Sequence, residues 1–228
     1  MLCVDLDGAL NRDAPSDPAR LGVHACAATV DVMPRGSLYI TGKRSADDLL
    51  NSNGTALIIG MLLDQQVPME WAFHGPFTLK ERLGHLDPRR IAGHDIDEFV
   101  SLCCEKPAIH RFPAAMGRRI HELCCTIAQQ YGGRTDNIWL KAVDGADLYA
   151  RLIQLPGFGD EKAKIFIALL GKRRGVQLQG WQKAAGKFGD DVKRSVADID
   201  SAESLAVVRD WKRAQKVAKL DKQDRPVV

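Results

Sequence analysis

The stretch LPGFGDEKAKIFIALLG, residues 155–171, decides the fold of this chain. The residues before it predict a helix over 144–154, which Asp144 can cap, and a second helix is predicted from Asp160. Gly157 and Gly159 allow a tight reversal between the two helices and leave backbone N–H groups exposed. The pattern therefore predicts two helices joined by a short glycine-containing turn.

Such a turn can bind a phosphate group. The N-terminus of the second helix carries a partial positive charge and backbone N–H groups without partners, and both favour an anion. Lys162 and Lys164 add positive charge in the first turns. The plain alternative is a hairpin whose turn only connects two packed helices. On the binding interpretation, the DNA-contacting residues are Leu155, Gly157, Phe158, Gly159, Lys162 and Lys164.

Composition indicates an ordinary globular protein. The 228 residues are 45% hydrophobic and 27% charged, and the longest clean apolar run, Ala56–Leu63, is too short to span a membrane. The N-terminus lacks a basic segment followed by an apolar one, so no secretory signal is predicted. We expect a soluble cytoplasmic protein whose six cysteines are reduced.

Charge is unevenly distributed along the chain. The formal net charge is +3, but residues 155–228 carry 16 basic and 10 acidic side chains, whereas residues 1–154 carry 16 basic and 19 acidic ones. A basic C-terminal third suggests a polyanionic partner, although a mixed-charge solvated helix over Arg209–Lys222 explains part of it.

The remaining patterns are helical, and the predicted fold class is all-α. Residues 1–36 show no sustained period and are expected to form a flexible N-terminal extension. Loops are expected around Phe73–Pro76 and His85–Pro88, which contain glycine, histidine and proline. Helices are expected over 46–50 with Ser45 as cap, over 54–67, 95–104 and 113–131, and from about Ser201 to Lys219.

The hairpin resembles the helix-hairpin-helix of the HhH-GPD DNA glycosylases, the superfamily of endonuclease III and of the adenine-mismatch and alkylpurine glycosylases. Two more stretches resemble family helices in the same order: ALIIGMLLDQQV at 56–67 and FPAAMGRRIHELCCTIAQQYGG at 112–133. The resemblance covers roughly residues 37–191. It implies a two-lobed helical domain that flips a damaged base into a pocket between the lobes, with residues 192–228 as a C-terminal helix packing on it.

Two departures from the family concern catalysis. The family's catalytic Asp stands in the loop after the second hairpin helix, but residues 175–181 read GVQLQGW and place Gln179 there. A neutral amide can position water, yet it supplies no negative charge. Bifunctional members carry a nucleophilic Lys where this chain has Glu161. Lys162 follows directly, but one residue turns a helical side chain by about 100°, so we expect it to point elsewhere.

The departures predict a monofunctional DNA N-glycosylase, which hydrolyses a modified base without lyase activity. The catalytic carboxylate must then come from another wall of the expected base pocket. Asp64 is the first candidate and Glu161 the second, and Gln179 with an ordered water is a third route. Both acids have ordinary interpretations, as a helix-end residue and a first-turn acid. By resemblance, Gln65 and Gln66 match the wedge that fills the gap left by the flipped base. Trp181 is a candidate base-stacking residue, as is Phe188, although core packing suits either.

Other ligands and partners follow from the same residues. No cysteine follows Cys125, so the iron–sulfur cluster of many family members is not expected, and the adjacent cysteine pairs do not suit zinc. The resemblance allows a monovalent cation at the hairpin. The expected partner is double-stranded DNA with a modified base, bound by a monomer associated with the nucleoid. The alternative is a catalytically silent helix-hairpin-helix module that senses damaged or distorted DNA.

Overall fold

A computed structural model describes residues 37–223, all of which belong to one compact unit, Asp31–Val228. These residues form α-helices and short 3-10 helices with no β-strand, which confirms the all-α class. No helix among them is long and apolar enough to cross a membrane. The expected N-terminal extension, residues 1–36, lies outside the described residues. The helices are α1 (Arg44–Ser52), α2 (Gly54–Leu63), α3 (Met69–Leu83), α4 (Pro88–Ala92), α5 (Ile96–Cys104), α6 (Pro113–Gln130), α7 (Asn137–Leu140), α8 (Gly145–Ile153), α9 (Asp160–Arg173), α10 (Trp181–Ala185) and α11 (Ala202–Gln223), with 3-10 helices η1 (Gly186–Phe188) and η2 (Val196–Asp198).

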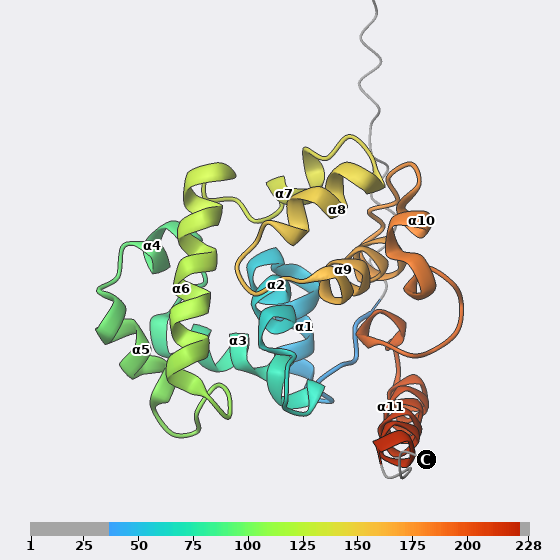
Figure 1. Cartoon of the computed structure of the whole chain (residues 1–228). Helices are drawn as coiled ribbons and strands as arrows, with labels where there is room; N and C mark the ends of the chain where they lie inside the picture. The colour runs from blue at the N-terminus through green and yellow to red at the C-terminus, as the bar shows by residue number, and fades with distance from the viewer. Residues whose placement is uncertain (1–36, 224–228) are drawn as a thin grey trace, which may run out of the picture. The chain divides into compact units, whose positions relative to one another are not determined.

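Helix α2 is the centre of the fold. All ten of its residues are buried, as expected for a helix that is apolar on every side. Helices α3–α6 pack together on one side of it and α8–α10 on the other (Figure 1). A Cβ at Gly60 would lie 2.6 Å from the Phe73 ring, so glycine lets α3 approach α2 closely.

Three local predictions are wrong. The helix predicted over 54–67 ends at Leu63, with Asp64 as its C-cap. Phe73–Pro76 form no loop: they lie inside α3, with Pro76 in its interior. Ala72, Pro76 and Leu79 are all buried at helical spacing, so packing against the core outweighs the helix-breaking tendency of proline. Ser45 does not cap α1, which starts at Arg44.

The predicted hairpin is present. Asp144 caps α8 by accepting a hydrogen bond from the Asp147 N–H at 2.8 Å, and α9 begins at Asp160. Between them Gly157 adopts φ +77°, and a Cβ there would lie 2.3 Å from Leu62 Cδ1. Glycine is required at this position by both backbone conformation and space. The apolar stripe of α9 is buried as predicted: Ala163, Phe166, Ile167 and Leu170.

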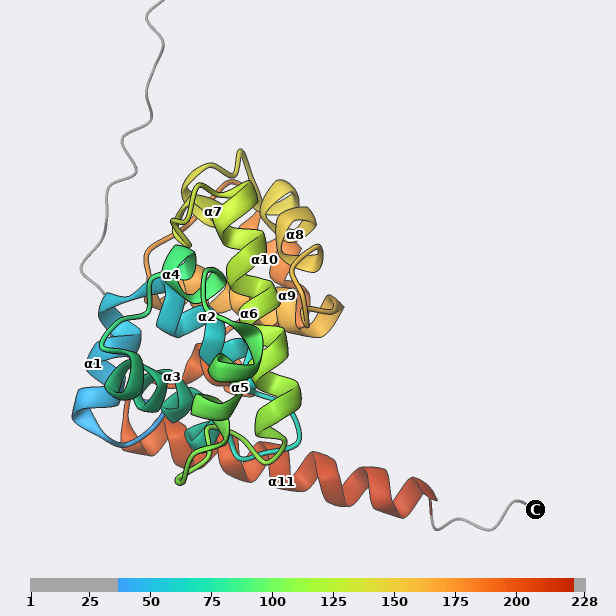
Figure 2. The same ribbon diagram turned by 90° about the vertical axis from the view of Figure 1, so that its left-hand side faces the viewer.

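A buried ion pair holds the start of the C-terminal segment to α9. Asp198, 4% exposed, accepts a hydrogen bond from Lys172 Nζ at 2.6 Å. Its other oxygen accepts bonds from the backbone N–H groups of Arg194 and Ser195 at 3.0 Å. From this anchor α11 runs along one side of the helical body and extends beyond α5 (Figure 2).

Substitution Asp198→Asn should destabilise the protein by roughly 3 kcal/mol, because it leaves a buried ammonium without its counter-charge. Urea denaturation measures the change in the free energy of unfolding. Asp191→Asn, at an exposed position seven residues earlier, is the control and should shift stability by less than about 0.5 kcal/mol. Equal effects of the two variants would contradict the anchoring role.

Candidate functional site

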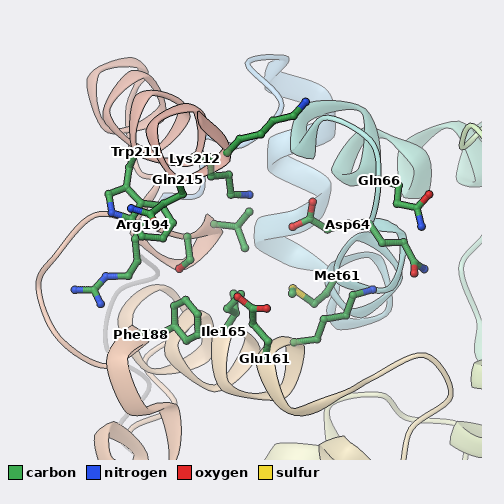
Figure 3. Close-up of a pocket in the computed structure, with 15 residues that line it drawn as sticks. Met61, Asp64, Gln66, Glu161, Ile165, Phe188, Arg194, Trp211, Lys212 and Gln215 are labelled. Carbon is green, nitrogen blue, oxygen red and sulfur yellow. The ribbon is translucent and has the colours of Figure 1, made fainter. Parts of the chain in front are cut away.

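A pocket of about 450 Å³ lies where the end of α2, the first turns of α9, residues 188–196 and the middle of α11 meet (Figure 3). This volume is in the range of small-molecule sites, about 300–1,000 Å³. Met61, Ile165 and Phe188 provide apolar wall, and Trp211 adds an aromatic ring from α11. The pocket thus combines apolar surface with a few charged groups.

Asp64 and Glu161, the two candidate acids, come together in this pocket. Asp64 is the C-cap of α2 and Glu161 lies in the first turn of α9. Figure 3 shows both carboxylates directed into the pocket, Asp64 from the end of α2 and Glu161 from α9. Burial raises the pKa of Asp64, while the ammonium groups of Lys212 and Lys162 act against that rise. Asp64 is therefore a partly desolvated carboxyl with two cations nearby to stabilise its ionised form.

Lys162 does not point away from the pocket, and that prediction is wrong. Both Glu161 and Lys162 line the pocket, because it wraps around the start of α9 and the long lysine side chain reaches back to α2. Its Nζ donates a hydrogen bond to the Leu62 carbonyl at 2.6 Å, an acceptor in the last turn of α2 that lacks an intrahelical partner. Burial lowers the pKa of Lys162 to about 8, although Asp64 favours the charged form.

The two candidate wedge residues differ in their environment. The Gln65 side chain is turned inward: its amide nitrogen lies 3.2 Å from the Leu62 carbonyl and 3.1 Å from Met116 Sδ. Gln66 is exposed and has φ +58°, within the left-handed region that non-glycine residues rarely adopt. Of the pair, Gln66 is the one whose side chain is available to a ligand.

The start of α9 has the features of an anion site. Gly159, its N-cap, makes no side-chain capping bond, so the first-turn N–H groups have no intrahelical partner. Gly159 is exposed, and a Cβ there would have no neighbour within 4 Å. Lys164 forms an ion pair with Asp160 at 2.8 Å, which offsets the negative charge of that first-turn acid.

Leu155 and Phe158, the other hairpin residues expected to contact DNA, are both buried. The Phe158 N–H donates to the Leu155 carbonyl at 3.0 Å, which closes the turn. Their side chains pack inside the hairpin, so they are not available to contact a ligand.

Gln179 and Trp181 lie away from this pocket. Gln179 is exposed, and its carbonyl accepts a bond from the Gly145 N–H at 2.9 Å. It lines a separate pocket beside α8 and α10. Trp181 fills space that glycine leaves open, since a Cβ at Gly171 would lie 2.5 Å from its ring. Core packing, the alternative for Trp181, is what the structure displays.

Several pocket residues were not identified from the sequence, and four of them lie on the C-terminal helix: Trp211, Lys212, Gln215 and Lys216. The predicted helix over 201–219 and its basic character were the available signals. Neither indicated which face of α11 would meet α2 and α9. Arg194 also lines the pocket and pairs with Asp190 at 2.8 Å.

The described residues contain no group of three or more His, Cys, Asp or Glu side chains that could hold a metal ion. Burial raises the pKa of the Cys103 and Cys124 thiols. Both thiols are therefore protonated at neutral pH.

Comparison with known proteins adds no assignment to this geometry. No protein-family model matches the chain, and neither a curated protein nor a solved structure matches it.

Proposed function

We propose that this protein is a DNA N-glycosylase of the HhH-GPD type, which flips a modified base into the pocket and hydrolyses its glycosidic bond. The observation that carries the proposal is the position of Asp64 and Glu161. They share a pocket whose rim includes the uncapped start of α9 and the exposed Gln66. The two groups of helices on either side of α2 are consistent with the two lobes of that fold.

The surface beside the pocket suits a DNA backbone and a disrupted base pair. The first-turn N–H groups of α9 can bind a phosphate without reading sequence. Phe112 is 45% exposed, and the Arg111 guanidinium lies 5.0 Å from the centre of its ring. An exposed aromatic ring and the exposed Gln66 can enter the space that a flipped nucleotide leaves.

The chemistry needs a negative charge near the sugar. As the C1′–N bond breaks, its electron pair leaves with the base, and positive charge develops on the sugar ring. The Asp64 carboxylate can stabilise this charge and accept the proton of the water that adds to C1′. Lys212 helps to keep Asp64 ionised, while Trp211 and Phe188 offer apolar surface to the base.

A catalytically silent DNA-sensing module is the main alternative. Gln179 favours it, because the residue at the place where the family resemblance implies the catalytic Asp is neutral and lies outside the pocket. A panel of duplexes carrying uracil, hypoxanthine, alkylated purines or oxidised bases separates the two. After incubation, alkali cleaves any abasic site. Cleavage of one duplex supports the enzyme, whereas binding without cleavage of any duplex supports the sensing module.

One observation favours a second activity, cleavage of the DNA strand at an abasic site. Lys162 presents an amine of lowered pKa to the same pocket. A neutral amine adds to the C1′ aldehyde of an abasic sugar and loses water to give an imine. Transfer of a C2′ proton to a carboxylate of the pocket then breaks the C3′–O bond and expels the 3′ phosphate. This proposed lyase activity differs from the prediction made from the sequence, which was a monofunctional glycosylase.

The hairpin proposal predicts that Gly159→Ala weakens binding to all duplexes by about tenfold. The new methyl group occupies open space in the free protein but blocks close approach of a phosphate. Fluorescence anisotropy with intact duplex measures the effect. Gly93→Ala, at an exposed glycine after α4, is the control; unchanged affinity in Gly159→Ala contradicts the proposed phosphate site.

Substitution Asp64→Asn should lower the single-turnover rate on a confirmed substrate by at least about a hundredfold, with little change in DNA affinity. The wild-type rate should fall on acidification as Asp64 is protonated. Because the pKa of Asp64 is raised, this fall should begin at a higher pH than for an ordinary aspartate. Glu161→Gln is the companion variant, and full rates in both exclude the carboxylate mechanism.

Lys162 should be trapped on DNA that already contains an abasic site. Borohydride reduces an imine to a stable bond, so wild-type protein should form a covalent complex visible by denaturing electrophoresis. Lys162→Arg should not form it. Lys164→Arg, in the same helix but paired with Asp160, is the control. If Lys162→Arg still forms the complex, another amine of the protein forms the imine. If the wild-type protein forms no complex, the monofunctional prediction holds.

A further inference from the structure

His110 is a buried side chain that the proposed chemistry does not use. It is 1% exposed and lies in the segment between α5 and α6. Its Nε2 is 3.0 Å from the Gln65 carbonyl oxygen, and its Nδ1 is 3.0 Å from the Phe112 backbone nitrogen. A carbonyl only accepts and a backbone N–H only donates. The ring is therefore neutral, with its proton on Nε2.

The ring connects two segments that are distant in sequence. One is the loop after α2, which carries Gln65 and Gln66, and the other is the entry to α6 at Phe112. The segment before α6 is also held from α3, because Trp71 Nε1 donates to the Ala108 carbonyl at 3.2 Å. His110 thus bridges the backbones of the two segments, beside the contact of the Gln65 side chain with Met116 Sδ of α6 at 3.1 Å.

Each of the two connected segments carries an exposed side chain beside the bridge. Gln66 follows the bonded Gln65 carbonyl and has φ +58°, a conformation that persists only where neighbouring contacts hold it. Phe112 carries the bonded N–H and is 45% exposed. The two hydrogen bonds of this imidazole are the backbone link between these exposed side chains, and they therefore contribute to the spacing between them.

We propose that His110 is a positioning residue whose neutral ring clamps the two loops, so that Gln66 and Phe112 project at a fixed spacing, and that acid opens this clamp. The clamp itself is a property of the free protein. Only its use, to present both side chains to DNA, rests on the proposed function.

The groups around His110 oppose its protonation. Burial lowers the pKa of His110, and so do the Lys162 ammonium from α9 and the Arg111 guanidinium beside it; the carbonyls of Gln65 and Leu63 act in the other direction. A second ring proton would face the Phe112 N–H, donor against donor. Because the folded-state pKa is lowered, the clamp contributes its full stability above the ordinary pKa of 6.5. That contribution is lost as the pH falls below this value.

The first test uses the free protein and residue-resolved amide hydrogen exchange. His110→Ala should speed exchange at Phe112 by at least about tenfold, because its acceptor is gone. In wild-type protein, protection at Phe112 beyond the intrinsic effect of pH should fall only as the pH drops below 6.5, because the pKa of His110 is lowered from that value. His110→Gln can still donate to the Gln65 carbonyl but does not titrate, so its protection should not depend on pH.

His121→Gln is the matched control, since His121 bonds the His94 carbonyl at 3.2 Å and does not contact the two loops. It should leave Phe112 exchange unchanged. Unaltered protection in His110→Ala, or a pH dependence that survives in His110→Gln, overturns the clamp.

The second test adds DNA and compares an intact duplex with one that carries a stable abasic analogue. His110→Ala should lose most of the preference for the abasic duplex while keeping its affinity for the intact one, and His110→Gln should restore that preference. If wild-type protein binds neither duplex, the proposed function fails, but the exchange data still decide the clamp. A preference that His110→Ala retains in full overturns the positioning role.

Discussion

The close packing of the α2 C-terminus against the hairpin is the constraint on which the site depends. A Cβ at Gly157 would overlap Leu62, and the Lys162 amine bonds the Leu62 carbonyl at 2.6 Å. Residue 62 therefore contacts both the turn and the first helical turn of α9. This contact brings Asp64, two residues later, to the same opening as Glu161. Any change that separates α2 from the hairpin removes the pocket as well as the packing.

The same contact gives the site its electrostatic character. Asp64 and Lys162 are each desolvated by the walls that bring them together, and burial acts on them in opposite senses: it raises the pKa of the acid and lowers that of the amine. Their mutual attraction works against both shifts. Burial thus favours the neutral form of each group, and the attraction between them favours the charged form of both. Opposing influences of this kind are common where a side chain exchanges a proton.

The hairpin could be predicted from the sequence because its determinants are local. Gly157 needs a positive φ, Asp144 caps α8, and the stripe on α9 repeats at helical spacing. The helical interior of α3 could not be predicted from the sequence, because Pro76 is tolerated only through burial against residues distant in the chain. The direction of Lys162 was missed for a similar reason. Helical geometry gives the angle at which a side chain leaves the backbone, whereas its end point depends on an acceptor 100 residues away. His110 gave no signal at all, since a single histidine has no pattern.

The largest gap between sequence and structure concerns α11. Its basic, amphipathic pattern predicted a helix, and the family resemblance ended before it, so it was expected only to pack on the domain. The structure makes it a wall of the pocket, with Lys212 the strongest influence that lowers the pKa of Asp64. Arg209 also pairs with Glu70 of α3 at 2.5 Å, which fixes α11 against the α2 side of the opening. A residue nearly 150 positions later thus favours the ionised form of a carboxylate at the end of α2. The site is therefore complete only when α2, the hairpin and α11 are all in place, and the segment beyond residue 191 belongs to it as much as the hairpin does.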